Sequence, residues 1–430
     1  MEEYQKYARE MLDFIEGSPS SFHVIDNVRQ SLEREGFLKL RENEDWAITP
    51  GGKYFVIRND SAMIAFQIPQ KKEIKGFHII ASHSDSPTFK VKEQPEMTVE
   101  ERYIRLNTEK YGGMILSTWL DRALSVAGRI AVKSTENEIM TKLVNVDKDL
   151  LVIPNVAIHL NRDINKGMEY NPQIDMLPLF ADKSESKGRN PLFKRVAKAA
   201  EVKQEDILGH DLFLYVSEKG RILGESGEFV LSPRLDDLQC VYTSFKAFQK
   251  SSPEDYINVC AVFDNEEVGS STGQGADSTF LEDTLSRIGE GLSADRSRYL
   301  RWIADSFFIS ADNAHAVHPN HPEKSDPTNR PYLNGGIVIK YHGSQKYTTD
   351  AVSAARMKDI CMRAGVPCQT YANRSDIIGG STLGNISVSH VSVSSVDVGL
   401  PQLAMHSAVE TAGTKDTSYA IKAFKIFYEE

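Results

Sequence analysis

The residues best suited to chemistry form an acidic cluster in the second half of the chain. Three acids lie within four residues directly after the apolar run Val259–Phe263: Asp264, Glu266 and Glu267. Carboxylates crowded at a strand end suggest a site for hard cations or a general acid and base pair. Consecutive glutamates can point in different directions, so one can bind a metal while the other faces water. The alternative is a solvated acidic turn.

A histidine and a carboxylate follow another short apolar run, Phe77–Ala81, which predicts a buried strand. Ligand-bearing residues favour the carboxyl ends of strands in open α/β sheets. His83 lies two positions before Asp85, and that carboxylate could orient the imidazole toward a metal. Alone, this H-x-D pattern is a weak signal.

Adjacent aspartates occur at Asp236 and Asp237. Buried neighbouring acids repel and cost desolvation energy unless cations neutralise them. Taken alone, the motif favours an exposed loop. A similar earlier pair is Asp121 and Arg122, where the arginine can compensate the charge, so a structural ion pair is expected there.

Further candidate ligands follow two later turns. The segment after the apolar run Phe307–Ser310 holds Asp312, His315 and His318, and His321 comes next. His406 follows a turn-rich stretch, where a structural histidine is common. Zinc accepts histidine nitrogen and carboxylate oxygen, and two metals roughly 3.5–4 Å apart need a shared carboxylate. Spacing alone does not select a dinuclear assignment.

These residues must be positioned by helices and strands. The order of the expected elements along the sequence predicts an α/β domain split by a β-richer insertion. Residues 1–90 and 232–430 form the expected α/β domain, and residues 91–231 form the insertion. Two amphipathic helices are expected in the first 36 residues. Other expected helices are Ser353–Ala364 and Ser418–Phe427, and expected strands are Tyr54–Arg58, Met63–Ile68, Val259–Phe263, Phe307–Ser310 and Ile337–Lys340.

The composition excludes several classes of protein. Of 430 residues, 40% are hydrophobic and 26% are charged, which excludes a disordered or collagen-like chain. No apolar run approaches the roughly 18 residues that a membrane span requires, and the acidic start is unlike a secretory signal. Four cysteines without a C-x-x-C pair indicate a reducing cytoplasm. A net charge of −10 argues against nucleic acid as the main partner.

Together these motifs resemble the M18 aminopeptidases, a family that includes aspartyl aminopeptidase. The segments that carry the resemblance are Ala81–Pro87, Pro233–Asp237, Phe263–Ser270, Ser310–Asn320 and Leu403–Ser407, with Pro154–Leu160 and Ile207–Leu212 inside the insertion. The resemblance implies a metallopeptidase domain with a central mixed β-sheet flanked by helices and interrupted by a β-rich dimerisation domain. It also implies a homo-oligomer, a tetrahedral dodecamer built from dimers.

The resemblance implies specific roles for residues of this chain. His83 and Asp312 would bind one divalent metal, Glu267 and His406 would bind a second, and Asp236 would bridge them. Glu266 would act as general base, and Asp85 would orient His83. The implied substrate contacts are His315, Lys340, Tyr347 and, in a neighbouring subunit's site, His159. The metals would be two zinc ions, with manganese or cobalt as alternatives.

The implied activity is removal of the N-terminal residue from peptides in the cytoplasm. Lys340 favours acidic N-terminal residues, because it can pair with their side chains. Three alternatives stay open: a preference for neutral apolar residues, a dinuclear amidohydrolase acting on acylated amino acids, and a non-enzymatic scaffold. A scaffold would have no need of Glu266 beside Glu267.

Overall fold

The computed structural model describes residues 2–71, 73–134, 138–186 and 190–430. The chain divides into two compact units. Unit 1 comprises Met1–Asp85, Gly220–Met405 and Glu410–Glu430, and unit 2 comprises Ser86–Lys219 and His406–Val409. Among the described residues, no helix has both the length and the apolar character needed to cross a membrane.

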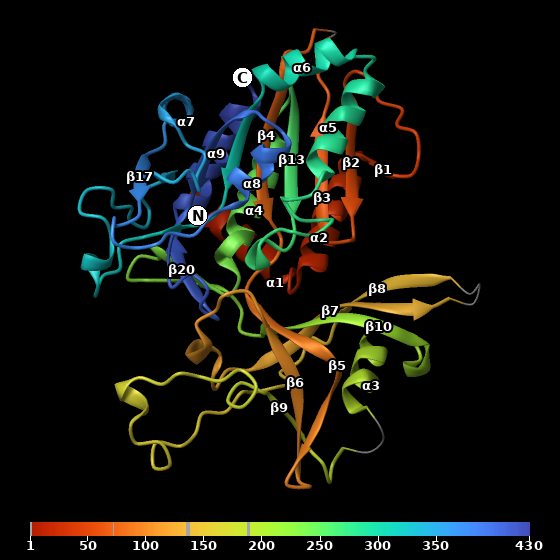
Figure 1. Ribbon diagram of the computed structural model, residues 1–430, viewed down its shortest axis with the longest axis vertical. Helices are drawn as coiled ribbons and strands as arrows, with labels where there is room; N and C mark the ends of the chain where they lie inside the picture. Colours follow the sequence, from red (N-terminus) through yellow and green to blue (C-terminus); the bar gives the residue numbers. More distant parts are fainter. Residues whose placement is uncertain (1, 72, 135–137, 187–189) are drawn as a thin grey trace. The chain divides into compact units, whose positions relative to one another are not determined.

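A nine-stranded mixed sheet runs through unit 1 (Figure 1). Its strands, in spatial order, are β1 (Leu38–Leu40), β2 (Lys53–Arg58), β3 (Ala62–Gln67), β13 (Tyr256–Phe263), β4 (Gly76–His83), β14 (Phe307–Ala311), β18 (Ser394–Gly399), β16 (Ile337–Tyr341) and β17 (Cys368–Ala372). β4 pairs in parallel with both β13 and β14. All eight residues of β4 are buried, as expected for a strand covered on both faces.

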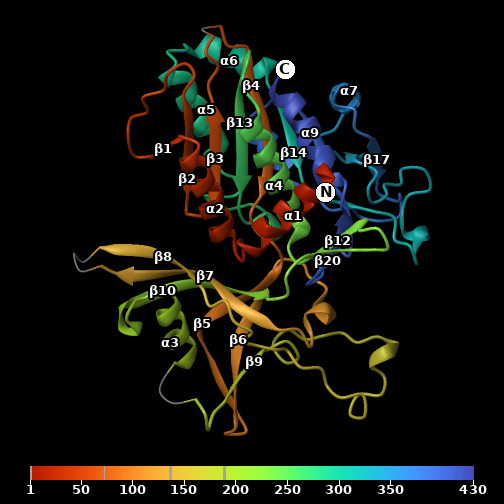
Figure 2. The same ribbon diagram turned by 180° about the vertical axis from the view of Figure 1, so that it is seen from behind.

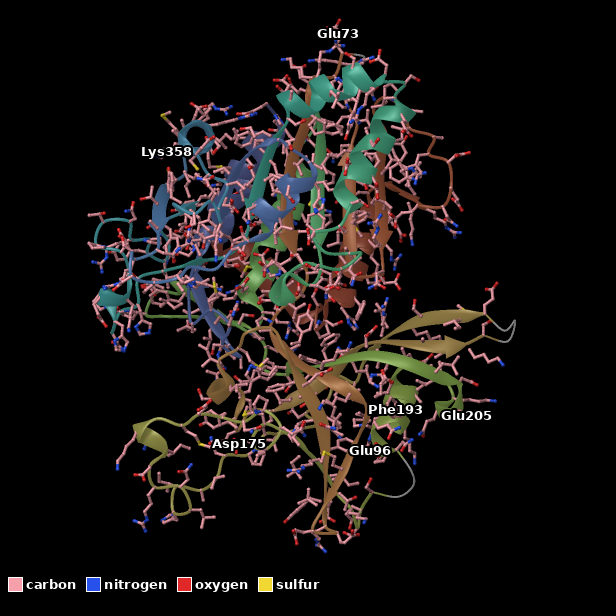
Figure 3. The ribbon with its side chains drawn as sticks, viewed as in Figure 1. Glu73, Glu96, Asp175, Phe193, Glu205 and Lys358 are labelled. Carbon is pink, nitrogen blue, oxygen red and sulfur yellow. The ribbon has the colours of Figure 1, made fainter. Side chains whose placement is uncertain are left out.

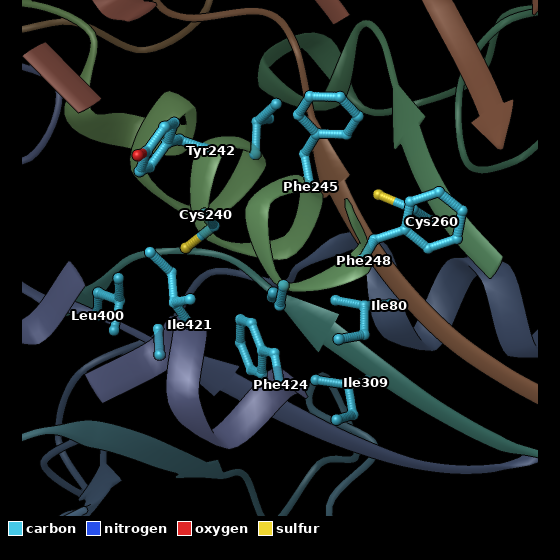
Figure 4. Packing of buried hydrophobic residues seen from close by; sticks show 14 of the residues in the cluster. Ile80, Cys240, Tyr242, Phe245, Phe248, Cys260, Ile309, Leu400, Ile421 and Phe424 are labelled. Carbon is cyan, nitrogen blue, oxygen red and sulfur yellow. The ribbon is translucent and has the colours of Figure 1, made fainter. Parts of the chain in front are cut away.

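Helices cover both faces of this sheet (Figures 1 and 2). They are α1 (Glu3–Glu16), α2 (Ser21–Arg34), α4 (Leu235–Lys250), α5 (Phe280–Gly291), α6 (Arg296–Asp305), α7 (Ala351–Ala364), α8 (Leu383–His390) and α9 (Asp416–Tyr428). Ile80 of β4 packs with Phe248 of α4 and Phe424 of α9 in one core cluster (Figure 4). The neighbouring Ile79 packs with Phe280 of α5 in a second cluster, because successive strand side chains point to opposite faces.

The expected α/β fold class is confirmed. The two helices expected in the first 36 residues are α1 and α2, and the later helices expected are α7 and α9. The expected strands correspond to β2, β3, β13, β14 and β16. Hydrophobic periodicity was sufficient for these elements because each buries one stripe or both faces in the core.

A smaller five-stranded sheet also belongs to unit 1. Its strands, in order, are β11 (Arg221–Leu223), β12 (Phe229–Ser232), β20 (Glu410–Gly413), β19 (Pro401–Leu403) and β15 (Ala314–His315). The short strand β15 follows β14 by only two residues and pairs in parallel with β19. This pairing fixes the backbone that leads away from Asp312.

Unit 2 is built on an antiparallel six-stranded sheet. In spatial order its strands are β8 (Ile139–Asn145), β7 (Leu124–Lys133), β10 (Ile207–Val216), β5 (Thr88–Val99), β6 (Tyr103–Tyr111) and β9 (Leu179–Asp182). Helix α3 (Pro191–Ala199) packs on it, and Glu96 accepts a hydrogen bond from the backbone N–H of Leu192 at 2.8 Å. Glu96 and Phe193 are labelled in Figure 3. The unit has its own core, which includes Phe89, Trp119 and Val196.

Candidate metal centre

Sheet register brings several candidate residues to one edge of the central sheet of unit 1. His83 ends β4 and pairs with Phe263, the last residue of β13. Asp85 and Glu266 therefore follow neighbouring parallel strands at the same edge. β14 lies on the other side of β4, with Ser310 opposite Ala81, so Asp312 also emerges there. Ligands distant in sequence are thus gathered by strand pairing.

His83 lies at the centre of a buried group of carboxylates. Its Nε2 atom is 3.6 Å from Asp236 Oδ1, 3.8 Å from Asp312 Oδ1 and 4.0 Å from Asp237 Oδ2. The possible ligand atoms of these four residues all lie within 4.8 Å of one another. A second group of the same compactness joins His83 with Glu266 and Glu267. Imidazole nitrogen and carboxylate oxygen together form a donor set that zinc accepts.

The two aspartates precede the regular part of α4. Asp236 and Asp237 have non-helical backbone angles, and the residue before α4, Arg234, has a φ of 57°. The backbone N–H of Asp236 donates to the buried Glu410 at 3.0 Å, and Asp237 Oδ2 accepts the backbone N–H of His83 at 3.1 Å. The start of a helix also favours negative charge electrostatically. Both aspartates are therefore held beside His83.

Asp85 connects the histidine to the acidic turn. Its Oδ1 atom is 3.3 Å from His83 Nδ1, and its backbone carbonyl is 3.1 Å from the same nitrogen. The Asp85 carboxylate also accepts the backbone N–H groups of Glu266 and Glu267, each at 3.1 Å. These glutamates begin a short 3-10 turn, Glu266–Val268, which follows Asn265 with a φ of 63°. One carboxylate thus positions a candidate ligand and the backbone of two others.

Burial and mutual repulsion dominate the electrostatics of this group. Burial, with Asp312 and Asp85 nearby, raises the pKa of Glu266 to about 7. Burial and Asp236 raise the pKa of Glu267 well above its ordinary value. Burial also raises the pKa of Asp237, to which Asp312 and Asp236 contribute. Carboxylates crowded in this way favour a bound cation, because it offsets both desolvation and repulsion. The residues present therefore fit a divalent metal.

The pKa of His83 reflects the same excess of negative charge. Burial alone would lower the pKa of His83, but Asp237, Asp236 and Asp312 raise it well above its ordinary value. A metal would replace that proton, since a ligating imidazole is neutral.

His406 belongs to the short segment His406–Val409, which groups with unit 2 although Met405 and Glu410 on either side belong to unit 1. Its carbonyl accepts the backbone N–H of Ile115 at 3.0 Å, and the N–H of Ala408 donates to Thr118 at 2.9 Å. The φ of His406 is 66°. The backbone of His406 is therefore held by hydrogen bonds within unit 2, and its metal-binding role stays a prediction.

Lys340 is fully buried in unit 1, with Nζ 3.3 Å from Asp312 Oδ2 and 5.4 Å from the ring centre of Tyr347. Burial would lower the pKa of Lys340, but Asp312 and Tyr347 raise it above its ordinary range. The lysine is therefore charged and already paired with one candidate metal ligand.

Two other predicted substrate contacts are exposed in the chain as described. His315 lies on β15 in unit 1, and its ring is 6.0 Å from that of Tyr371. His159 lies in unit 2, in a turn between β8 and β9. Their roles toward a substrate stay predictions.

One expectation was wrong. Asp121 and Arg122 do not pair with each other in the described contacts. Asp121 accepts hydrogen bonds from the backbone and side chain of Asn155 at 2.9 and 2.7 Å, and Arg122 pairs with Glu218 at 2.9 Å. Both side chains instead bond to residues distant in sequence, and Asp121 has a φ of 59° in a turn that follows η1 (Leu116–Trp119).

Sequence reasoning named Asp237 and Asp264 without giving either a role, and it did not identify the buried Asp397 of unit 1. Asp237 was visible in the adjacent pair, but sequence cannot show which aspartate faces His83. Burial and the nearby Asp85 raise the pKa of Asp264 to about 7. Asp397 interrupts the apolar strand β18, and an isolated acid in such a strand is the signal that could have identified it.

A histidine and several carboxylates gathered at one edge of an α/β sheet define the arrangement of a metal-dependent enzyme. The family model described as "Aminopeptidase I zinc metalloprotease (M18)" matches residues 14–428. The chain is 50% identical over 427 residues to "Probable M18 family aminopeptidase 2" of Clostridium novyi, covering 98% of each chain. It is 38% identical to the protein of the same description from Pseudomonas putida, covering 97% of each.

Solved structures agree with these sequence relatives. The chain in "Cryo-EM structure of the Ape4 and Nbr1 complex" has a TM-score of 0.96 at 36% identity, covering 99% of this chain and 86% of that one. The chain in "Structure of S. cerevesiae mApe1 dodecamer" has a TM-score of 0.85 at 28% identity, covering 99% and 97%. The protein belongs to the M18 aminopeptidase family, so it is a metal-dependent aminopeptidase that hydrolyses peptides.

Proposed function

We propose that the protein removes N-terminal residues from peptides at a dinuclear metal centre, with Glu266 as the general base. The observation that carries this proposal is the buried group of His83, Asp236, Asp237 and Asp312, joined through His83 to Glu266 and Glu267. His83 and Asp312 would hold one ion, Glu267 and His406 the other, and Asp236 would bridge them. Asp236 contributes to the raised pKa of Glu267, which supports its place between the two sets.

The metals, when bound, supply an activated water and polarise the scissile carbonyl. The remaining steps belong to residues of the chain. Glu266 takes a proton from the attacking water and returns it to the leaving amine. A carboxylate with a pKa near neutrality suits both transfers, and burial raises the pKa of Glu266 to about 7. Asp85 keeps His83 and the backbone of Glu266 in place during the exchange.

The test is the substitution Glu266→Gln, which keeps the shape of the side chain but removes the base. Turnover should fall by roughly 10²–10⁴-fold, the usual contribution of general base catalysis. Metal content, measured by elemental analysis, should stay that of the unchanged protein. Glu282→Gln on the exposed side of α5 is the matched control and should retain full turnover. Near-normal turnover of Glu266→Gln would refute the assigned role.

We further propose that both ions are zinc, since the family model describes a zinc metalloprotease. Carboxylate-rich ligand sets do not fix metal identity, so manganese and cobalt remain alternatives. Stripping the protein with a chelator and restoring activity with each metal separately discriminates among them. Zinc failing to restore activity where manganese or cobalt succeeds would contradict the zinc assignment.

For specificity, we propose a preference for acidic N-terminal residues. The buried ammonium of Lys340 uses one of its three N–H donors on Asp312, which leaves donors for a substrate carboxylate. A preference for neutral apolar residues is the alternative. A panel of unblocked aminoacyl chromogenic amides decides between them by kcat/KM.

We also propose a cytoplasmic homo-oligomer, with unit 2 forming dimers within a tetrahedral dodecamer and His159 reaching a neighbouring subunit's site. The support is the likeness to the mApe1 chain solved as a dodecamer and the exposed position of His159. Sedimentation measures the assembly, and His159→Ala should lower activity without changing the assembly. Full activity of that variant would contradict the proposed contact, and fractionation of cells tests the compartment.

A further inference from the structure

A carboxylate outside the metal group ties two separate segments of unit 1 to the central sheet. Asp397 lies on β18 and is fully buried. Its Oδ2 atom accepts hydrogen bonds from the backbone N–H of Thr348 at 2.5 Å and from the Thr348 hydroxyl at 2.8 Å. Its Oδ1 atom accepts the hydroxyl of Thr382, the residue before α8, at 2.5 Å. The two oxygens of one carboxylate thus hold different segments.

The same two segments are held by further close contacts to β18. The backbone N–H of Asp397 donates to the Thr349 hydroxyl at 3.0 Å. A Cβ atom placed on Gly384, in the first turn of α8, would lie only 2.5 Å from Asp397 Oδ1. Glycine therefore permits the close approach of α8 to this carboxylate.

The segment fixed by Asp397 carries a candidate substrate contact. Tyr347, which directly precedes Thr348, is buried in a small cluster with Tyr371, Val338 and Ala314. Its ring also lies beside the ammonium of Lys340, at 5.4 Å. Asp397 is not part of any group of possible metal ligands among the described residues. Its contacts therefore concern the segment that carries Tyr347, whereas the metals would be held by other residues.

We propose that Asp397 is a positioning residue for substrate recognition, which fixes the Tyr347–Thr349 segment and the start of α8 around the site. This inference rests on the proposed function, in which Tyr347 and Lys340 contact the substrate. A charged acceptor that takes three donors from two segments holds both more firmly than neutral groups do. Loss of that acceptor loosens Tyr347 and weakens substrate binding before it affects the chemical step.

The test uses Asp397→Asn in the full-length, metal-loaded enzyme. KM for an unblocked aminoacyl amide should rise about tenfold while kcat changes far less, since the loss is in substrate positioning. Metal content should be unchanged, and amide hydrogen exchange at Thr348 should become faster. Thr382→Val, which removes a single hydroxyl, should raise KM in the same direction and serves if the first variant does not fold.

The matched control is Asp416→Asn. Asp416 is equally buried and accepts backbone N–H groups from Asn334 and Gly336 at 2.7 and 2.9 Å, but it touches neither segment. It should alter stability without changing KM. Unchanged KM in folded Asp397→Asn and Thr382→Val, with the wild type active, would overturn the inference alone. A wild-type enzyme without metal-dependent aminopeptidase activity would instead overturn the proposed function.

Discussion

Asp85 offers the most direct way to test how the site is organised. Asp85→Asn keeps the size of the side chain but removes its charge and one acceptor. The wild-type carboxylate lies 3.3 Å from His83 Nδ1 and accepts two backbone N–H groups at 3.1 Å. An amide can satisfy only part of this set, because its NH₂ group would face another donor. Losing such an outer contact typically weakens metal affinity 10–100-fold, or roughly 1.4–2.7 kcal/mol.

The assay is a competition titration of zinc against a chromogenic chelator, followed by elemental analysis of the dialysed protein. Asp255→Asn makes the same chemical change at the opposite end of β13, where Asp255 pairs with Lys71 and Lys75 on the surface. That control should bind zinc as the wild type does. If Asp85→Asn binds zinc as tightly as the control, Asp85 does not orient His83 and the reasoning fails.

Two other predictions concern single side chains of unit 1. Lys340→Met should lower kcat/KM for Asp and Glu substrates roughly 10–100-fold more than for Leu substrates, the worth of a charged hydrogen bond. Equal losses would mean that Lys340 serves only Asp312. Burial lowers the pKa of His78 to about 3, so the unfolded chain takes up a proton between pH 6.5 and 3 that the folded chain excludes. The free energy of unfolding should therefore decrease as the pH is lowered, by about 2 kcal/mol at pH 5. Urea unfolding at pH 7 and 5 should show that His78→Phe lacks this loss, and an identical pH dependence in both proteins would refute it.

Much of the fold could be predicted because its strands are either fully buried or bounded by strong turn signals. β4 and β13 are buried strands made mostly of apolar residues, and polar residues follow each strand directly, beginning with Ser84 and Asp264. Their carboxyl ends were therefore recognisable as places for ligands. His83 and Glu266 were identified for this reason, and the structure places both in one group.

The remaining features depend on tertiary contacts that leave little trace in sequence. Asp236 and Asp237 are the same residue type, and the non-helical backbone angles at the start of α4 decide how each faces His83. Lys340 is separated from Asp312 by 28 residues, and their pairing depends on strand order in the sheet. Asp397 is a single acid in β18, and its partners lie 49 and 15 residues away.

Charge balance explains why these features occur together. Six carboxylates lie close to His83: Asp85, Asp236, Asp237, Glu266, Glu267 and Asp312. Lys340 is the buried cation paired with them among the described ion pairs, and it neutralises a single charge. Two divalent ions would add about four positive charges, which leaves the group close to neutral with one carboxylate able to accept a proton. The chain's net charge of −10 therefore says little about its substrate, because the proposed metals and Lys340 set the local potential.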